Sequence, residues 1–176
     1  GSRFIRNQAN DNGGAAYLAG DTTVENSEFQ DNSATQGGGI QVAAGSTLTA
    51  AGSTLEGNQA VDGGGLFNQG TASLVNTTLS GNIATNDGGA IKTFAGSARL
   101  AVRNSTLTQN RAASRGGGLF EQGTQSTSLL NTIVADNSSP IATDVSGTFV
   151  DQGGNLIGVS DGAIGLTNST LVGAAA

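Results

Sequence analysis

The chain contains no cysteine, histidine, methionine or tryptophan among its 176 residues. Without cysteine it can form neither disulfide bonds nor metal sites built from thiolates. Charged residues are also scarce, at 11%, and their balance gives a net charge of −6. Because an acidic chain lacks the basic face that binds phosphates, we expect no nucleic-acid partner.

Long apolar runs and proline are scarce as well. No stretch approaches the roughly 20 apolar residues of a membrane-spanning helix, so we expect no membrane insertion by this segment. No signal peptide is recognisable, and we expect any export signal to lie outside this sequence or to have been removed. Proline occurs once, against 29 glycines. These glycines do not fall at every third place, which excludes collagen.

The residues that are abundant form a repeat. An apolar residue stands three places before an asparagine, and a pair or triplet of glycines follows after a short gap, as in residues 55–65 and 107–118. The motif asparagines are Asn7, Asn32, Asn58, Asn82, Asn110 and, in a weaker copy, Asn137. Successive copies lie about 24 to 28 residues apart, a period typical of a solenoid.

Each period contains three short strand candidates. Residues 78–82, 40–42 and 99–102 are examples of the three types. Short runs with period-two alternation, separated by glycine and asparagine, favour strands over helices. Three strands per turn predict an all-β fold, a single-stranded parallel β-helix (β-solenoid) of about six or seven turns of about 25 residues. We expect residues 1–176 to form one such domain.

Parallel stacking in register would place like residues above one another, about 4.8 Å apart. We expect one inward apolar column made of Phe4, Phe29, Leu55, Leu79, Leu107 and Ile133. A second column would contain Ile40, Leu66, Ile91 and Leu119. The motif asparagines should form an internal structural ladder, in which side-chain amides bond to one another and to turn backbone. A sparser column before the first strand contains Asn26, Asn76, Asn104, Asn131 and Asn168.

The repeat loosens after Asn137. The Ser-Ser-Pro sequence at 138–140 interrupts it, and residues 168–171 restore it. Ile133 and Leu171 are separated by about one period plus a dozen residues. We therefore expect an irregular turn or an insertion around residues 138–166.

The repeats resemble those of a known family. Residues 29–32 and 88–91 are similar to the paired motifs of chlamydial polymorphic outer-membrane proteins. The C-terminal third, at 131–137, 144–149 and 154–158, resembles bacterial surface β-helix repeat proteins of the choice-of-anchor type. This resemblance implies a secreted or surface-bound solenoid with a right-handed coil.

Two aspartates are the candidate chemical site. Asp62 and Asp87 precede the glycines of adjacent turns, so their carboxylates could lie about one strand spacing apart. They are the candidate metal ligands, but calcium needs about six oxygens or more. The alternative is a pair of solvated corner aspartates, with Arg115 as the partner of Asp87. With no histidine and a single lysine, we predict no catalytic residues, no cofactor and no enzymatic activity.

The residues that directly follow the glycines form a candidate binding face. They should alternate with the inward column and point outward; its members are Tyr17, Phe67, Lys92 and Phe120. Exposed aromatic rings on a flat sheet can stack on surface glycans or pack against another copy of the chain. The alternative is that an adjoining loop covers them.

The two ends of the sequence suggest the biological role. Residues 1–7 are already in repeat register, and residues 168–171 open a new turn, so we expect a solenoid that is uncapped at both ends. Such a solenoid would be a segment of a longer stalk or adhesin, or a subunit that stacks head to tail into a filament. Either role is structural, extracellular or on the surface of a bacterium. The alternative function is a polysaccharide-binding or polysaccharide-degrading β-helix of the pectate-lyase kind.

Overall fold

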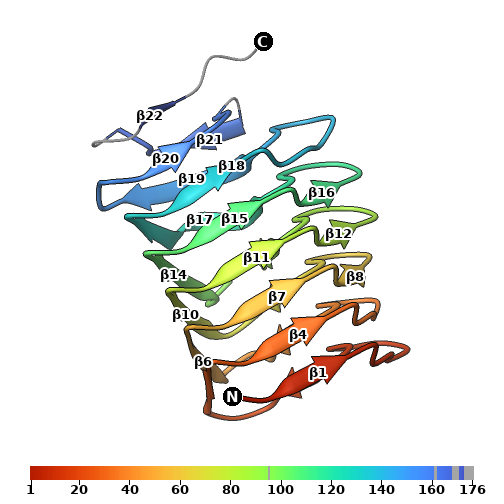
Figure 1. Ribbon diagram of the computed structural model, residues 1–176. Helices are drawn as coiled ribbons and strands as arrows, with labels where there is room; N and C mark the ends of the chain where they lie inside the picture. Colours follow the sequence, from red (N-terminus) through yellow and green to blue (C-terminus); the bar gives the residue numbers. More distant parts are fainter. Residues whose placement is uncertain (95, 161, 168–170, 173–176) are drawn as a thin grey trace.

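The computed structural model describes residues 1–94, 96–160, 162–167 and 171–172. In this part of the chain the fold is all-β and contains no helix, so no helix there could cross a membrane. Parallel strands stack into a β-solenoid of about six turns with roughly 26 residues each. The strands of the front sheet run from left to right while the chain rises from the N-terminus, so the coil is right-handed (Figure 1).

The front sheet contains one strand from each turn. The order is β1 (Arg3–Ile5), β4 (Glu28–Gln30), β7 (Thr54–Glu56), β11 (Thr78–Ser80), β15 (Thr106–Thr108), β18 (Ile133–Ala135), β20 (Leu156–Ile157) and β22 (Leu171–Val172). In β4, β7, β11 and β15, the phenylalanine or leucine at the middle of the strand is buried in the coil, and the flanking polar residues are more exposed.

The second sheet contains two stacks, which β17 (Leu119–Leu130) joins by continuing round the corner. The strands after the glycines are β2 (Ala16–Leu18), β5 (Ile40–Val42), β9 (Leu66–Asn68) and β13 (Ile91–Thr93). The alternating runs are β3 (Thr22–Glu25), β6 (Thr47–Ala51), β10 (Thr71–Val75) and β14 (Arg99–Arg103). Near the C-terminus, β19 (Val145–Asp151) pairs with β17 and with β21 (Gly162–Ile164).

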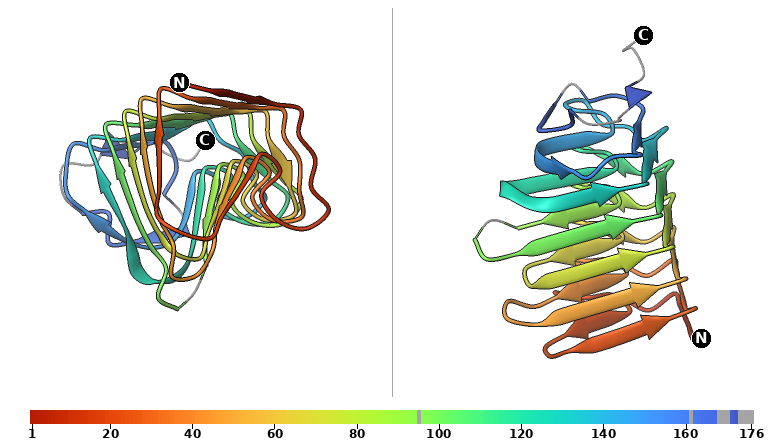
Figure 2. Two further views of the ribbon diagram at one scale, coloured as in Figure 1. Left: turned by 90° about the horizontal axis from the view of Figure 1, so that it is seen from below. Right: turned by 90° about the vertical axis from the view of Figure 1, so that its left-hand side faces the viewer.

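A fourth, two-residue strand follows the ladder asparagine in three turns, and the sequence did not predict it. These strands are β8 (Gln59–Ala60), β12 (Ile83–Ala84) and β16 (Arg111–Ala112), and each buries its alanine. They form an arm, which gives the coil a bent outline when it is viewed along its axis (Figure 2). The arm meets the next wall at the paired glycines. A Cβ on Gly64 would lie 2.6 Å from the carbonyl oxygen of Ile83 in β12 and 2.5 Å from that of Gly89, so only glycine allows this close approach.

The inward columns have the expected register with one exception. Leu55 pairs with Leu79 and Leu79 with Leu107, but Leu107 pairs with Val134. The placement of Ile133 in this column is therefore wrong; Ile133 pairs with Thr106 and is 44% exposed. Val134 stands three places before Asn137, as Leu107 does before Asn110. The column of Ile40, Leu66, Ile91 and Leu119 is in register and buried, and Val145 extends it.

For residues 138–166 the sequence predicts an irregular turn or an insertion, and the strand pairing there is irregular. Ile133 pairs with Leu156, and Leu156 pairs with Leu171. Residues 138–166 therefore belong to shortened turns rather than to one turn with a long insertion, and β19 shifts register against β17. Asn168, with the rest of the 168–170 restart, lies outside the described residues.

The other members of the sparse asparagine column occupy corners. Asn26, Asn76, Asn104 and Asn131 have φ values of 49°, 51°, 51° and 48°. Asparagine tolerates this left-handed conformation better than most residues, and Gly52 takes it with φ 59° at the equivalent corner. This column therefore sets the chain direction before each strand of the front sheet.

Candidate functional site

The motif asparagines lie one above another inside the coil. In each pair, the Nδ2 of one asparagine donates to the Oδ1 of the asparagine in the next turn, at 2.8 to 2.9 Å. The same Oδ1 also accepts the backbone N–H of the preceding asparagine, as between Asn58 and Asn82 at 3.0 Å. Asn32, Asn58, Asn82 and Asn110 are 0% exposed. Because every bond runs in the same direction, the ladder is polarised along the coil axis.

Asp144 ends this ladder. Its Oδ1 accepts the Nδ2 of Asn137 at 2.8 Å and the backbone N–H of Asn137 at 2.9 Å. Its Oδ2 accepts the backbone N–H of Val159 at 2.7 Å. A carboxylate accepts hydrogen bonds without donating any. The chain of donors that runs along the ladder therefore ends at the buried carboxylate of Asp144.

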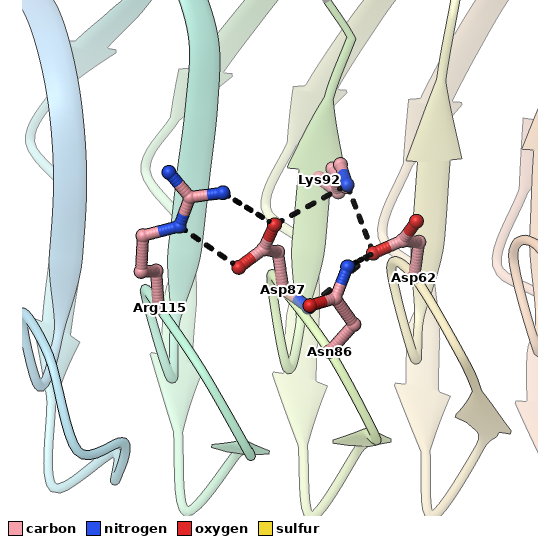
Figure 3. Close-up of polar contacts among 5 residues, drawn as sticks. All are labelled: Asp62, Asn86, Asp87, Lys92 and Arg115. Atoms are coloured by element: carbon pink, nitrogen blue, oxygen red, sulfur yellow. Dashed lines mark hydrogen bonds and ion pairs between the residues drawn. The ribbon is translucent and has the colours of Figure 1, made fainter.

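The two candidate aspartates belong to a charged cluster beside the arm (Figure 3). Lys92 on β13 places its Nζ 2.9 Å from Asp62 Oδ1 and 3.4 Å from Asp87 Oδ2. Arg115 donates to both carboxylate oxygens of Asp87, at 3.1 and 2.9 Å. Asn86 Nδ2 donates to Asp62 Oδ1 at 2.9 Å. The expected partnership of Arg115 with Asp87 is present, and Lys92 adds a second cation.

Burial and charge act in opposite directions on Asp87, whose side chain is 2% exposed. Burial acts to raise the pKa of Asp87, but the hydrogen bond from Arg115 and the charges of Lys92 and Arg115 hold it below the ordinary value. The hydrogen bond to Asp87 raises the pKa of Arg115. Asp87 is therefore a carboxylate inside the protein, matched by two neighbouring cations.

This arrangement suits a salt-bridge network better than a calcium site. The ammonium of Lys92 and the guanidinium of Arg115 already neutralise the two carboxylates. These cationic groups lie at positions that a calcium ion would need oxygen ligands to fill. No group of three or more acidic side chains converges within the described residues. Asp62 and Asp87 thus lie close together, as the spacing predicts, but their common neighbour is Lys92.

The candidate binding face is stacked in register, but most of it is covered. Tyr17, Gln41, Phe67, Lys92 and Phe120 follow one another in successive turns. Tyr17 is 51% exposed, whereas Phe67, Lys92 and Phe120 are at most 6% exposed. Of the two alternatives for these three residues, cover by an adjoining part of the chain is therefore the one that holds.

The cover comes from the segment after the arm and from the loops beyond the strands. The guanidinium of Arg115 lies 4.3 Å from the ring centroid of Phe120, and Lys92 Nζ lies 5.5 Å from it. The rings of Phe94 and Phe67 are 6.0 Å apart. The covering groups are thus Arg115, which lies between the arm and the glycines, and Phe94, which follows β13. The repeat period alone does not reveal this cover.

The structure contains a second ladder, made of hydroxyl groups, which the sequence did not predict. Hydroxyl groups just before the front strands accept backbone N–H groups from the preceding turn, at Ser27, Ser53 and Ser105. Each of these hydroxyls also donates to the carbonyl two residues earlier. The signal that could have revealed them was serine or threonine directly after each corner asparagine or glycine.

One family model matches the chain. Residues 76–93 match the Chlamydia polymorphic membrane protein repeat. The match covers Asn76, β11, Asn82, β12 and β13, which is most of one turn. This turn is thus similar to a repeat of bacterial surface proteins, and together with the solenoid fold it suggests a protein of the outer surface. No curated protein and no solved structure matches the chain.

Proposed function

We propose that this chain is an extracellular structural β-solenoid of a bacterial surface protein, as a segment of a stalk or adhesin. The observation that carries the proposal is the continuous asparagine ladder, which joins successive turns from Asn7 to Asp144 through hydrogen bonds that are buried from Asn32 onward. Buried networks whose members are all satisfied stabilise one arrangement of the chain. A rod of stacked turns suits a spacer that holds other parts of a protein away from the cell.

The match to a chlamydial polymorphic membrane protein repeat supports the surface location. The resemblance of residues 131–158 to surface β-helix proteins of the choice-of-anchor type fits the same role. A filament of copies stacked head to tail is the second candidate. It is favoured by the regular stacking of the front sheet, in which each turn pairs in parallel with the next.

We also propose that the chain is not an enzyme. General acid–base cleavage of a glycosidic bond needs two carboxyl groups that face the substrate. The buried carboxylates instead bond to groups of the chain itself: Asp87 to Arg115, Asp144 to Asn137, and Glu121 to Gly123 and Thr127. The polysaccharide-active alternative would have to use side chains outside this set.

Labelling of intact cells tests the location. An antibody against this chain should bind the producing bacterium without permeabilisation, and protease added to intact cells should remove the signal. Labelling only after permeabilisation would refute the surface role. A cytoplasmic protein probed in the same samples controls for cell lysis.

Two assays of the purified chain test the role. Electron microscopy with mass measurement separates a rod segment, which stays monomeric, from a filament subunit, which forms fibres. A panel of acidic and neutral polysaccharides should show no release of new ends. Cleavage that disappears in Asp62→Ala or Asp87→Ala would overturn the non-enzymatic assignment.

A further inference from the structure

Lys92 is the single lysine of the chain, and its environment is unusual for an amine. Its side chain is 7% exposed, and its Nζ lies between the carboxylates of Asp62 and Asp87 (Figure 3). The ring of Phe120 forms an apolar wall 5.5 Å away. A buried amine held against a carboxyl group by the fold has the proximity that an intramolecular reaction needs.

The hydrogen bonds at Asp62 are directed at one oxygen. Asn86 Nδ2 donates to Oδ1 at 2.9 Å, and the backbone N–H of Asp87 donates to the same atom at 3.3 Å. Lys92 Nζ approaches this oxygen from the neighbouring turn at 2.9 Å. Two fixed donors on one carboxyl oxygen have the arrangement of an oxyanion hole, which stabilises negative charge that develops when a nucleophile adds to the carbon.

We propose that Lys92 and Asp62 form an intramolecular amide bond between Nζ and Cγ. The ammonium and the carboxylate together contain every atom of the product, which is one amide and one water. A proton of Nζ passes to Oδ2 of Asp62, which leaves a neutral amine beside a neutral carboxyl group, and the amine then adds to Cγ of Asp62. Charge develops on Oδ1, which Asn86 and the Asp87 amide stabilise. A second proton from Nζ moves by way of the Asp87 carboxylate to Oδ2, which already carries the first, the Cγ–Oδ2 bond breaks, and water leaves.

The geometry distinguishes the two carboxylates. Asp87 has both oxygens bonded to Arg115 and lies 3.4 Å from Nζ, so it is placed to accept a proton rather than to be attacked. Asp62 is closer, and its donors all converge on Oδ1. The amide would join the turn that contains Asp62 to the turn that contains Lys92. It would supply a covalent side-chain cross-link between turns, which a chain without cysteine cannot form as a disulfide.

Digestion with a lysine-specific protease tests this proposal directly. The denatured chain with a free lysine is cut once, after Lys92, into two fragments. The cross-linked chain should stay uncut and should be lighter than the sequence mass by one water. A succinimide at Asp62–Gly63 would also lose water, but it would leave Lys92 cleavable. A synthetic peptide with free Lys92 in its own sequence context shows that the site itself can be cut.

Three variants complete the test. Asp62→Asn should yield the same final mass as the wild-type chain, because the amide loses ammonia in place of water. Lys92→Arg and Asp87→Ala should both have the full sequence mass, and denatured Asp87→Ala should be cut after Lys92. Circular dichroism checks that each variant folds. Wild-type protein that has the full mass and is cut completely would overturn the proposal, whatever the variants do. A cross-link mapped by fragmentation to Asp87 would overturn the assignment of Asp62.

Discussion

Asn82 offers the sharpest test of the asparagine ladder, because its side chain is fully buried. Its Oδ1 accepts the backbone N–H and the Nδ2 of Asn58, at 3.0 and 2.9 Å. Its Nδ2 donates to the carbonyl of Leu55 and to Asn110 Oδ1, each at 2.9 Å. Asn82→Ala removes these four bonds at once. It leaves two donors of Asn58 and the carbonyl of Leu55 without these partners, in a place that water does not reach.

The expected loss of stability follows from the number of buried polar groups that lose their hydrogen-bond partner. A buried polar group left unsatisfied costs about 1 to 3 kcal/mol. Asn110 Oδ1 keeps the backbone N–H of Asn82 as a partner at 2.9 Å, and Asn58 Nδ2 keeps the carbonyl of Phe29 at 2.9 Å. The backbone N–H of Asn58 and the carbonyl of Leu55 therefore carry most of the loss. Asn82→Ala should therefore reduce the free energy of unfolding by about 2 to 6 kcal/mol. This is a large part of the roughly 5 to 15 kcal/mol that stabilises a typical domain.

Chemical denaturation monitored by far-ultraviolet circular dichroism measures the effect. The matched control is Asn10→Ala, the same substitution at an exposed asparagine, which should change stability by at most about 0.5 kcal/mol. A loss below about 1 kcal/mol for Asn82→Ala would refute the reasoning. It would mean that the abandoned groups find new partners and that the apolar columns alone hold the turns together.

Other positions make further predictions. Asp144→Ala leaves the Asn137 donors and the Val159 N–H without an acceptor and should lower the free energy of unfolding by about 2 to 5 kcal/mol. Asp144→Asn keeps an acceptor and should lower it less. Equal losses in the two variants would contradict the role of Asp144 as terminal acceptor. The folded pKa of Asp87 lies below its ordinary 3.8, so its charge stabilises the fold above pH 3.8, and this contribution is lost as the pH falls through the folded value. The free energy of unfolding should therefore fall less steeply below pH 3.8 in Asp87→Asn than in the wild-type chain. The same slope in both proteins would contradict a stabilising charge on Asp87. Gly64→Ala brings a Cβ to 2.5 Å from the Gly89 carbonyl oxygen and should cost about 3 kcal/mol or more, whereas Gly20→Ala, with open space around it, should be nearly neutral in the same denaturation experiment.

The repeat in the sequence was sufficient to determine the coil. Asparagines, glycines and leucines that recur with one period have a single efficient arrangement, in which like residues stack and neighbouring turns share their hydrogen bonds. The ladder from Asn7 to Asn137 and the column from Ile40 to Leu119 follow directly from that spacing. Where two β-branched residues are adjacent, as at Ile133 and Val134, alternation does not say which one points inward. The motif spacing does say it, because Val134 stands three places before Asn137, and Val134 is the residue that pairs with Leu107.

Only the tertiary structure decided what covers the candidate binding face. A repeat period fixes which residues lie above one another, but it does not fix the angle at which the chain turns within one coil. That angle depends on close backbone contacts at glycines such as Gly64, and it buries Phe67 and Phe120, which alternation alone assigns to the surface. The same bend brings Lys92 against Asp62, which lies in the preceding turn. Asp144 is likewise invisible in the period, because it takes the next place in the ladder only seven residues after Asn137, through a turn far shorter than the repeat.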